Sequence, residues 1–331
     1  MSEARFSAFR GAQALVTGGA GLIGSTLARR LVELGAKVAL VDNMMPEGGA
    51  NRANIAAIGD RAALTVGDIR DADTMRALLP GADFLFDLAA QTSHLDSMKA
   101  PFDDLAINAT AQLLLLETCR AAAPEVTIVH AGTRQIYGRP RYVPVDEAHP
   151  LNPADVNGVN KMAGEAYHLM FHSAYGINTR SLRLTNVYGP GMRIRDARQN
   201  FLGIWLRRVL EGEPFEVWGG EQRRDMVFVE DAADAFLAAA LSPETQGLAL
   251  NIGGDAPYSL AEIAVAMVAA NGGGRFEAKE FPAERKRIDI GDFVTDDRKF
   301  RALTGWAPTT PLAEGLARSL DYYRRNLAAY L

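Results

Sequence analysis

Short apolar and β-branched runs alternate with longer segments of helical hydrophobic spacing along the first half of the chain. Each short run predicts a buried strand, and each longer segment predicts a helix with one apolar face. Strands that alternate with helices favour a parallel sheet covered by helices on both faces. The predicted fold is therefore α/β, with a doubly wound parallel sheet. We expect strands at Ala14–Thr17, Lys37–Val41, Ala62–Val66, Phe84–Leu88, Val126–His130 and Thr179–Leu184, and helices at Leu22–Leu34, Ala72–Leu79, Pro101–Ala123 and Val156–Tyr175.

Composition narrows the class of protein without identifying its chemistry. The 331 residues carry a net charge of −5, and no basic block is dense enough to predict nucleic-acid binding. The single cysteine, Cys119, excludes a disulfide within the chain. The longest apolar run, near Leu113–Leu116, is too short to span a bilayer, and residues 1–13 lack a signal-peptide core. We expect a soluble, cytoplasmic protein with no membrane partner and no metal site.

Three glycines follow the first predicted strand, at the point where the first helix begins. Gly18 permits a tight turn, Gly21 lets the backbone approach a pyrophosphate, and Gly24 lets helix and strand pack closely. The pyrophosphate would lie on the helix N-terminus, where unpaired N–H groups favour an anion. The second strand ends at Asp42, whose carboxylate accepts hydrogen bonds from a ribose and repels a 2′-phosphate. The pattern predicts a site for NAD in preference to NADP.

Ligands of such sheets bind beyond the carboxyl ends of the strands. The Gly-, Pro- and Asn-rich segment 44–54 is expected to be a loop near the adenosine end of the cofactor. Residues at the starting turn and at the other strand ends complete the predicted cofactor site: Leu22, Ile23, Asn43, Asp68, Ile69, Leu88, Ala89 and Ala90.

Several motifs together carry a resemblance to a known family. They are Thr17-Gly-Gly-Ala-Gly-Leu-Ile-Gly24, Tyr137-Gly138, Arg183-Leu-Thr-Asn-Val-Tyr-Gly-Pro190, Arg224-Asp-Met-Val-Phe-Val-Glu-Asp231 and Gly305-Trp-Ala-Pro308. Over almost its whole length the chain resembles the extended short-chain dehydrogenase/reductases, specifically the NAD-dependent nucleotide-sugar epimerases and dehydratases. The resemblance implies a Rossmann NAD-binding domain from residues 1–184 plus 225–253 and a smaller α/β substrate domain from residues 185–224 plus 254–331. It also implies a homodimer formed through the helices at 101–123 and 156–175.

The resemblance further implies which residues bind a nucleotide-diphosphate sugar, although neither the nucleotide nor the sugar follows from the sequence. Arginine forks match phosphate oxygens in pairs, so arginines suit the diphosphate. The implied contacts are Asn186, Arg224 and one of Arg285 or Arg287 to the diphosphate, Asn200 and Phe201 to the nucleotide, Val217 and Trp218 as walls of the base, and Asp289 near the ribose.

The family's acid–base chemistry uses a tyrosine four residues before a lysine on one helix, together with a Ser or Thr from the preceding strand. Thr133 matches the Ser/Thr position and Lys161 matches the lysine, which also anchors the cofactor ribose. The tyrosine position is Asn157, and no lysine in the chain has a tyrosine four residues before it. An amide does not titrate near neutrality, so Asn157 can position a hydroxyl group but cannot take its proton.

Several other residues remain candidates for the missing base. Lys161 is one if burial lowers its pKa, and Tyr137, Tyr142 and His94 are the others. His94 lies in a loop, 91–98, after the fourth strand, where a structural or substrate-orienting role is the alternative interpretation. Related dehydratases carry acidic residues where this chain has Arg134-Gln135, so the epimerases are the better match.

Three interpretations stay open at this point. The protein is an NAD-dependent nucleotide-sugar epimerase that acts through a 4-keto hexose with a non-standard base. Alternatively, it binds NAD and a nucleotide sugar without turnover, because both phosphate-binding motifs are intact. In the third interpretation it is a dehydratase, reductase or isomerase that acts on a sugar nucleotide that is already a ketone.

Overall fold

The computed structural model describes residues 3–45, 47–196, 201–281 and 290–331 of the chain. Its centre is a seven-stranded sheet in which every pairing is parallel. The strand order places β4 and β2 on opposite sides of β1, so the chain reverses its direction of winding beside the first strand. From edge to edge the strands are β10 (Ala249–Ile252), β6 (Thr179–Leu184), β5 (Thr127–Thr133), β4 (Phe84–Asp87), β1 (Gln13–Thr17), β2 (Lys37–Asp42) and β3 (Ala62–Val66).

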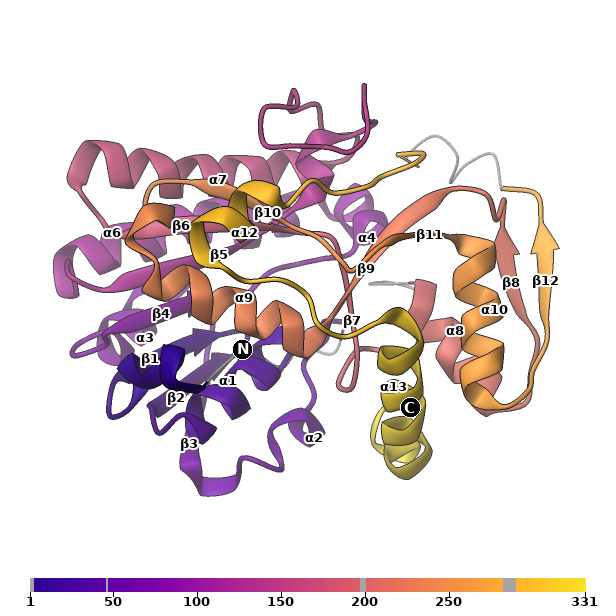
Figure 1. Cartoon of the computed structure of the whole chain (residues 1–331). Helices are drawn as coiled ribbons and strands as arrows, with labels where there is room; N and C mark the ends of the chain where they lie inside the picture. Colours follow the sequence, from indigo (N-terminus) through magenta and orange to yellow (C-terminus); the bar gives the residue numbers. More distant parts are fainter. Residues whose placement is uncertain (1–2, 46, 197–200, 282–289) are drawn as a thin grey trace.

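Helices cover both faces of this sheet (Figure 1). Successive side chains of a strand point to opposite faces, and β1 shows the result: Ala14 and Val16 belong to one hydrophobic cluster and Leu15 to another. The first cluster lies under α1 (Leu22–Glu33), α9 (Val229–Leu241) and α12 (Arg298–Thr304), and the second under α3 (Ala72–Leu78), α6 (Ala111–Ala122) and α7 (Val156–Tyr175). Burial on both faces explains why central strands such as β1 and β4 carry consecutive apolar residues, Ala14–Val16 and Phe84–Phe86.

A smaller lobe lies at the carboxyl edge of the sheet, on the right of Figure 1. Its core is a third hydrophobic cluster that includes Trp205, Phe215 and Ile263. Its helices are α8 (Phe201–Leu210), α10 (Leu260–Asn271) and α13 (Leu312–Asn326), and its strands are β7 (Asn186–Tyr188), β8 (Phe215–Trp218), β9 (Arg223–Phe228), β11 (Pro257–Ser259) and β12 (Phe276–Lys279). The short elements that complete the chain are α2 (Arg52–Ile55), α4 (His94–Lys99), α5 (Pro101–Leu105) and η1 to η6 (Glu3–Phe9, Gly59–Arg61, Ala106–Thr110, Arg134–Tyr137, Pro243–Thr245 and Leu327–Ala329).

The predicted α/β fold and parallel sheet are confirmed, and β3, β6 and α7 have the expected bounds. Three local predictions were wrong. The helix expected at 101–123 is divided into α5, a π-helical turn at Ala106–Thr110 and α6. The loop expected at 91–98 ends early, because the Ser93 hydroxyl caps a helix that begins at His94. The strand expected to end at His130 continues to Thr133.

The second half of the chain contributes to both parts of the molecule. Strand β10 extends the large sheet, whereas β9 pairs with β7 and β11 in the three-stranded sheet. The division into residues 1–184 plus 225–253 and 185–224 plus 254–331 stays a prediction. Within the described ranges, no helix combines the length and apolar character that crossing a membrane requires.

Candidate active site

The turn between β1 and α1 has the close backbone contacts that demand glycine. Gly18 has a φ of +64°, and a Cβ on it would lie 2.9 Å from the carbonyl carbon of Leu88. A Cβ on Gly24 would lie 2.2 Å from the carbonyl oxygen of Gly18, so any side chain there would displace the turn. Helix α1 starts at Gly21 with no side-chain cap and no acidic residue in its first turn. Its first N–H groups are thus available to an anion, as a dinucleotide pyrophosphate requires.

The Asp42 carboxylate fixes the backbone at the adenosine end of the site. Its carboxylate accepts hydrogen bonds from the backbone N–H of Ala20 at 3.0 Å and of Met44 at 2.9 Å. The carboxylate is therefore tied to the glycine turn, where the remaining lone pairs suit two ribose hydroxyls. Next to it, Asp68 accepts hydrogen bonds from Arg70 and Asn43, and the Arg70 guanidinium lowers the pKa of Asp68 to about 2. Two carboxylates at this end disfavour a 2′-phosphate.

One cavity extends along the carboxyl ends of the central strands, from Asp42 past the glycine turn to Asn186. Every residue that the sequence predicted for cofactor binding lines it, and Thr133, His94, Asn157 and Lys161 line its other end. The structure thus brings the candidate cofactor site and most of the candidate catalytic residues into one space. The residues fit NAD: a glycine turn without Cβ atoms, an uncapped helix N-terminus and a fixed carboxylate.

Asn157 lies in the first turn of α7 and is 2 % exposed. Both hydrogens of its amide nitrogen are used, because Nδ2 donates to the carbonyl oxygen of Gln91 at 2.8 Å and to Oδ2 of Asp104 at 3.0 Å. Asp104, also buried, accepts a second hydrogen bond from Asn160 at 2.8 Å. Asn157 therefore fastens the segment after β4 to α7, and it does not offer a proton acceptor.

Lys161 lies one turn further along α7. Its ammonium donates to the carbonyl oxygen of Ala131 at 2.9 Å, which fixes it at the end of β5. Burial lowers the pKa of Lys161, and the nearby carboxylates of Asp87, Asp104 and Glu165 oppose that shift. Thr133 ends β5 beside it, and its hydroxyl oxygen accepts the backbone N–H of Gln135 at 3.2 Å.

His94 is the first residue of α4 and is held from two sides. Its Nδ1 lies 2.8 Å from Oδ2 of Asp155, and its Nε2 lies 2.8 Å from Nε2 of Gln135. Asp155 is the N-cap of α7, and its other oxygen accepts the backbone N–H of Gly158 at 2.7 Å. Burial alone would raise the pKa of Asp155, but its bonds to His94 and Gly158 outweigh burial and lower it. The carboxylate is therefore ionised.

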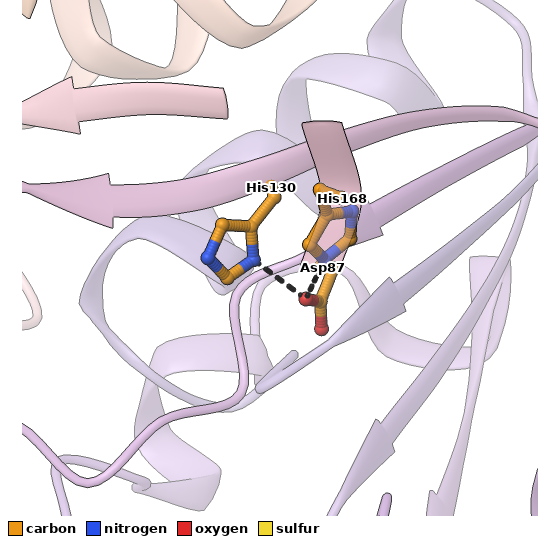
Figure 2. A group of neighbouring side chains, drawn as sticks. All are labelled: Asp87, His130 and His168. Carbon is orange, nitrogen blue, oxygen red and sulfur yellow. Dashed lines mark hydrogen bonds and ion pairs between the residues drawn. The ribbon is translucent and has the colours of Figure 1, made fainter. Parts of the chain in front are cut away.

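A second histidine–aspartate group lies below the cavity, inside the core (Figure 2). Asp87 at the end of β4 accepts hydrogen bonds from Nδ1 of His130 at 2.8 Å and from the Thr17 hydroxyl at 2.8 Å. The ring of His168, from α7, stacks on that of His130 with centroids 4.3 Å apart. The group joins β1, β4, β5 and α7 under the strand ends.

The hydrogen bonds fix the protonation state of His168. Its Nε2 faces the side-chain oxygen Oε1 of Gln112 at 3.1 Å, so Nε2 carries the hydrogen, and Nδ1 accepts a hydrogen bond from the Thr179 hydroxyl at 2.8 Å. Burial lowers the pKa of His168 well below its ordinary value, and the ring is neutral. One ligand atom from each of Asp87, His130 and His168 lies within 4.8 Å of the others, but Nε2 of His168 is protonated and the two imidazoles stack, so we interpret the three as a hydrogen-bonded core group.

The other predicted residues are spread more widely. Tyr137 is fully buried away from the cavity: its hydroxyl donates to Asn251 and accepts from Arg183, and burial raises the pKa of Tyr137 to about 12. Tyr142 is 44 % exposed and donates to Asp146. Neither is presented as a base.

Of the residues predicted to bind substrate, Asn186 lines the cavity, and its Oδ1 accepts a hydrogen bond from Arg134 at 3.1 Å. Val217 is buried in β8, with Trp218 partly exposed beside it, and Phe201 begins α8. The Arg224 guanidinium donates to the backbone oxygens of Arg223 and Gly291. Asn200, Arg285, Arg287 and Asp289 lie outside the described residues.

Sequence reasoning missed three side chains of the site. Arg193 lines the cavity near Asn186, and Gln135 and Asp155 hold His94. Asp155 had a signal in the sequence, since an aspartate directly before the first residue of a helical pattern is typical of an N-cap. That this cap also contacts His94 depends on where α4 packs, which hydrophobic spacing does not give.

Comparison with known proteins agrees with this geometry. A family model described as the NAD dependent epimerase/dehydratase family matches residues 14–253. The UDP-glucose 4-epimerase of Mycolicibacterium smegmatis is 32% identical over 314 residues, which cover 94% of this chain and 98% of the relative.

Two solved structures have the same fold. One is a UDP-glucose 4-epimerase of Thermotoga maritima, solved with UDP-glucose, with a TM-score of 0.85, 29% identity and coverage of 95% of this chain and 99% of that chain. The other is a dTDP-glucose 4,6-dehydratase of Streptomyces venezuelae, solved with NAD, with a TM-score of 0.85, 26% identity and coverage of 96% and 98%. The chain belongs to the NAD dependent epimerase/dehydratase family, its cofactor is NAD, and its sheet is the Rossmann-like sheet of that family.

Proposed function

We propose that the protein is an NAD-dependent nucleotide-sugar epimerase that inverts C4 of a UDP-hexose through a 4-keto intermediate. The observation that carries the proposal is the single cavity in which the dinucleotide-binding turn and the groups Thr133, His94 and Lys161 meet. A hexose at the Thr133 end would lie against the reactive end of a cofactor anchored at Asp42. The UDP-glucose 4-epimerase that is 32% identical supports the choice of UDP and of C4.

The residues of the first part of the chain hold the cofactor. The N–H groups at the start of α1 bind the pyrophosphate, and Asp42 accepts the adenosine ribose hydroxyls. Lys161, fixed by Ala131, donates to the second ribose. Bound NAD supplies reversible acceptance of a hydride from the sugar carbon.

At the sugar end, we attribute much of the rate of the reaction to the positioning of the reacting groups. Thr133 donates its hydroxyl hydrogen to the reacting sugar oxygen, because its own oxygen already accepts from Gln135. Asn157 stands where the family has tyrosine and holds the segment that bears His94 against α7. Holding the reacting groups in contact converts an encounter into a unimolecular step, which lowers the barrier by several kcal/mol.

For the remaining contacts we keep the assignments that the resemblance implies. Asn186 binds the diphosphate, and its Nδ2 is a buried donor without a partner among the described residues, as a site that awaits an acceptor would have. The other proposed contacts are Phe201 and Asn200 to the nucleotide, Val217 and Trp218 as walls of the base, Arg224 and Arg287 to the diphosphate and Asp289 to the ribose.

A second copy of the chain is the proposed partner at α5, α6 and α7. Apolar side chains of α5 and α7 stand exposed on this side: Phe102 is 81 % exposed, Val159 47 % and Leu105 42 %. They line a shallow hollow together with Met98 and Pro153. Exposed apolar patches of this kind mark protein contacts.

Light scattering should give the mass of a dimer, and F102E should give a monomer. A monomeric wild type contradicts this assembly.

A substrate screen tests the proposed activity. Purified protein with NAD is incubated with UDP-, GDP-, CDP- and dTDP-hexoses, and the products are identified by NMR. We expect conversion of a UDP-hexose into its C4 epimer. Tight binding of sugar nucleotides without any turnover would instead favour a silent binding protein, and a 6-deoxy-4-keto product would favour a dehydratase.

A further inference from the structure

The proposed reaction needs a group that takes a hydroxyl proton, and the family's tyrosine is absent. Among the described residues that line the cavity, the titratable or charged side chains are Asp42, Asp68, His94, Arg134, Lys161 and Arg193. Asp42 and Asp68 lie at the adenosine end, and an arginine does not give up its proton in proteins. His94 and Lys161 are left at the sugar end.

Lys161 is poorly arranged for proton transfer. Burial lowers the pKa of Lys161 against the opposing carboxylates of Asp87, Asp104 and Glu165, but its Nζ is fixed on the carbonyl oxygen of Ala131 at 2.9 Å and the residue is only 7 % exposed. His94 differs, because an imidazole changes its charge between pH 5 and 8. Its side chain is 31% exposed, so a substrate can reach it.

The contacts of His94 select the protonation form that a base requires. Asp155 is ionised and can only accept, so Nδ1 of His94 carries the hydrogen at 2.8 Å. The amide nitrogen of Gln135 lies 2.8 Å from Nε2 and 3.4 Å from Nδ1 of His94, so it rests against the face of the ring and does not lie along the lone pair of Nε2. The second oxygen of Asp155 is bonded to Gly158 at the N-terminus of α7, which prevents the carboxylate from turning away.

Gln135 links His94 to Thr133, the proposed partner of the sugar oxygen. Its amide nitrogen contacts the imidazole of His94, and its backbone N–H donates to the Thr133 hydroxyl oxygen at 3.2 Å. His94 and Thr133, which both line the cavity, are therefore connected through one residue.

We propose that His94 is the acid–base catalyst, with Asp155 as the residue that positions its ring and stabilises its charge. This inference rests on the proposed function. Nε2 of His94 takes the proton of the sugar's C4 hydroxyl, and the O–H electron pair becomes the second bond of the ketone. The C4 hydrogen leaves with its electron pair as hydride, to the oxidised nicotinamide. The keto sugar then rotates in the site, the hydride returns to the opposite face of C4, and His94 gives the proton back to the sugar oxygen.

The charged groups on α4 and on the elements next to it bear on the expected pH dependence. They are Asp96 and Lys99 on α4, Asp103 and Asp104 on α5, Arg134 on η4, and Asp155 and Lys161 at α7. Among these, Asp155 is the one that bonds the ring. Removing its charge destabilises the imidazolium, so the unprotonated base persists to lower pH. The acidic limb of kcat/KM should then move to lower pH in D155N. Asparagine also caps helices well, so this variant keeps α7 intact.

The experiment compares wild type, H94Q, D155N and the control H172Q, whose ring lies near the far end of α7 and bonds the carbonyl oxygen of Ile177. We expect kcat to fall at least about 100-fold in H94Q and about tenfold in D155N, magnitudes typical of general-base catalysis. The Kd of UDP-glucose and the bound NAD content should stay within about threefold of wild type. H172Q should keep wild-type kcat.

A second measurement does not depend on turnover. This measurement is NMR of protein with isotope-labelled histidine nitrogens. The chain has 5 histidines, and the imidazole nitrogen signals that are missing from the H94Q spectrum belong to His94. We expect the Nδ1–H form of His94 in wild type and loss of this preference in D155N. If wild type turns over a UDP-hexose but H94Q keeps more than half its kcat, the assignment of His94 is wrong and the proposed function stands. If wild type turns over no sugar nucleotide, both are wrong. An Nε2–H ring in wild type would also overturn the assignment.

Discussion

Replacing Asn157 by leucine tests whether this amide is a structural fastener. Leucine branches at the same carbon as asparagine and has the same number of side-chain heavy atoms, but it has no hydrogen-bond donor. In N157L the carbonyl oxygen of Gln91 and the Oδ2 atom of Asp104 therefore each lose a bond from Nδ2. Both acceptors lie against a residue that is 2 % exposed, so water cannot replace the lost donors without rearrangement.

The magnitude follows from the two bonds. A hydrogen bond to a charged acceptor is worth about 1.5–3 kcal/mol, and one between neutral groups about 1 kcal/mol. Asp104 keeps its bond from Asn160, which limits the damage. The free energy of unfolding should thus fall by about 2–4 kcal/mol. The segment that carries His94 should also loosen, so catalytic activity should fall together with stability.

Urea unfolding followed by both circular dichroism and tryptophan fluorescence measures this loss, and agreement of the two signals checks that unfolding is two-state. The matched control is N152L, because Asn152 lies five positions earlier on the exposed surface. N152L should change the free energy of unfolding by less than about 0.5 kcal/mol. If N157L were as stable as N152L, the account of Asn157 as a buried double donor would be refuted.

Three further predictions follow from the cofactor site and the core. In D42A, NAD should bind about 10- to 100-fold more weakly by calorimetry, because Ala20 and Met44 lose their acceptor and the ribose loses its partner; an unchanged Kd would contradict this role. G24A should lose NAD binding altogether while keeping the far-UV spectrum, since its Cβ would lie 2.2 Å from the Gly18 oxygen; full occupancy by NAD would contradict the crowded turn. His168 has a lowered pKa when folded, so below pH 6.5 the unfolded chain binds a proton that the folded chain refuses. The free energy of unfolding should therefore fall by up to about 1.4 kcal/mol per pH unit as the pH drops below 6.5, and this slope should weaken in H168Q; an equal slope in both proteins would show that His168 titrates normally.

The sequence predicts the fold well because apolar strand runs and helical hydrophobic spacing are both local signals. Apolar strand runs such as Ala62–Val66 and the helical spacing from Val156 to Tyr175 give elements with the expected bounds. The three glycines and Asp42 lie within one unit, β1–α1–β2, so their spacing is visible in a single sequence. The predicted residues of this region all line the cavity.

The sugar end could not be predicted to the same depth, because its residues meet only through packing. Asp155 and His94 are far apart in the chain and lie 2.8 Å apart because α4 docks on α7. Tyr137 was predicted near the reaction from its motif. In the structure its side chain instead turns into the core, where its hydroxyl bonds Arg183 and Asn251. Hydrophobic spacing does not decide which way such side chains turn.

The most direct test of the proposed function is an NMR time course of wild-type protein with NAD and UDP-glucose. The account predicts that anomeric signals of UDP-galactose appear and that the two sugars approach equilibrium with no net consumption of NAD. The contradicting result has two parts. Calorimetry shows that NAD and UDP-glucose are both bound, yet no UDP-galactose forms from UDP-glucose at any pH between 6 and 9. In that case the proposal that this chain is a C4-epimerase without a tyrosine at position 157 is wrong.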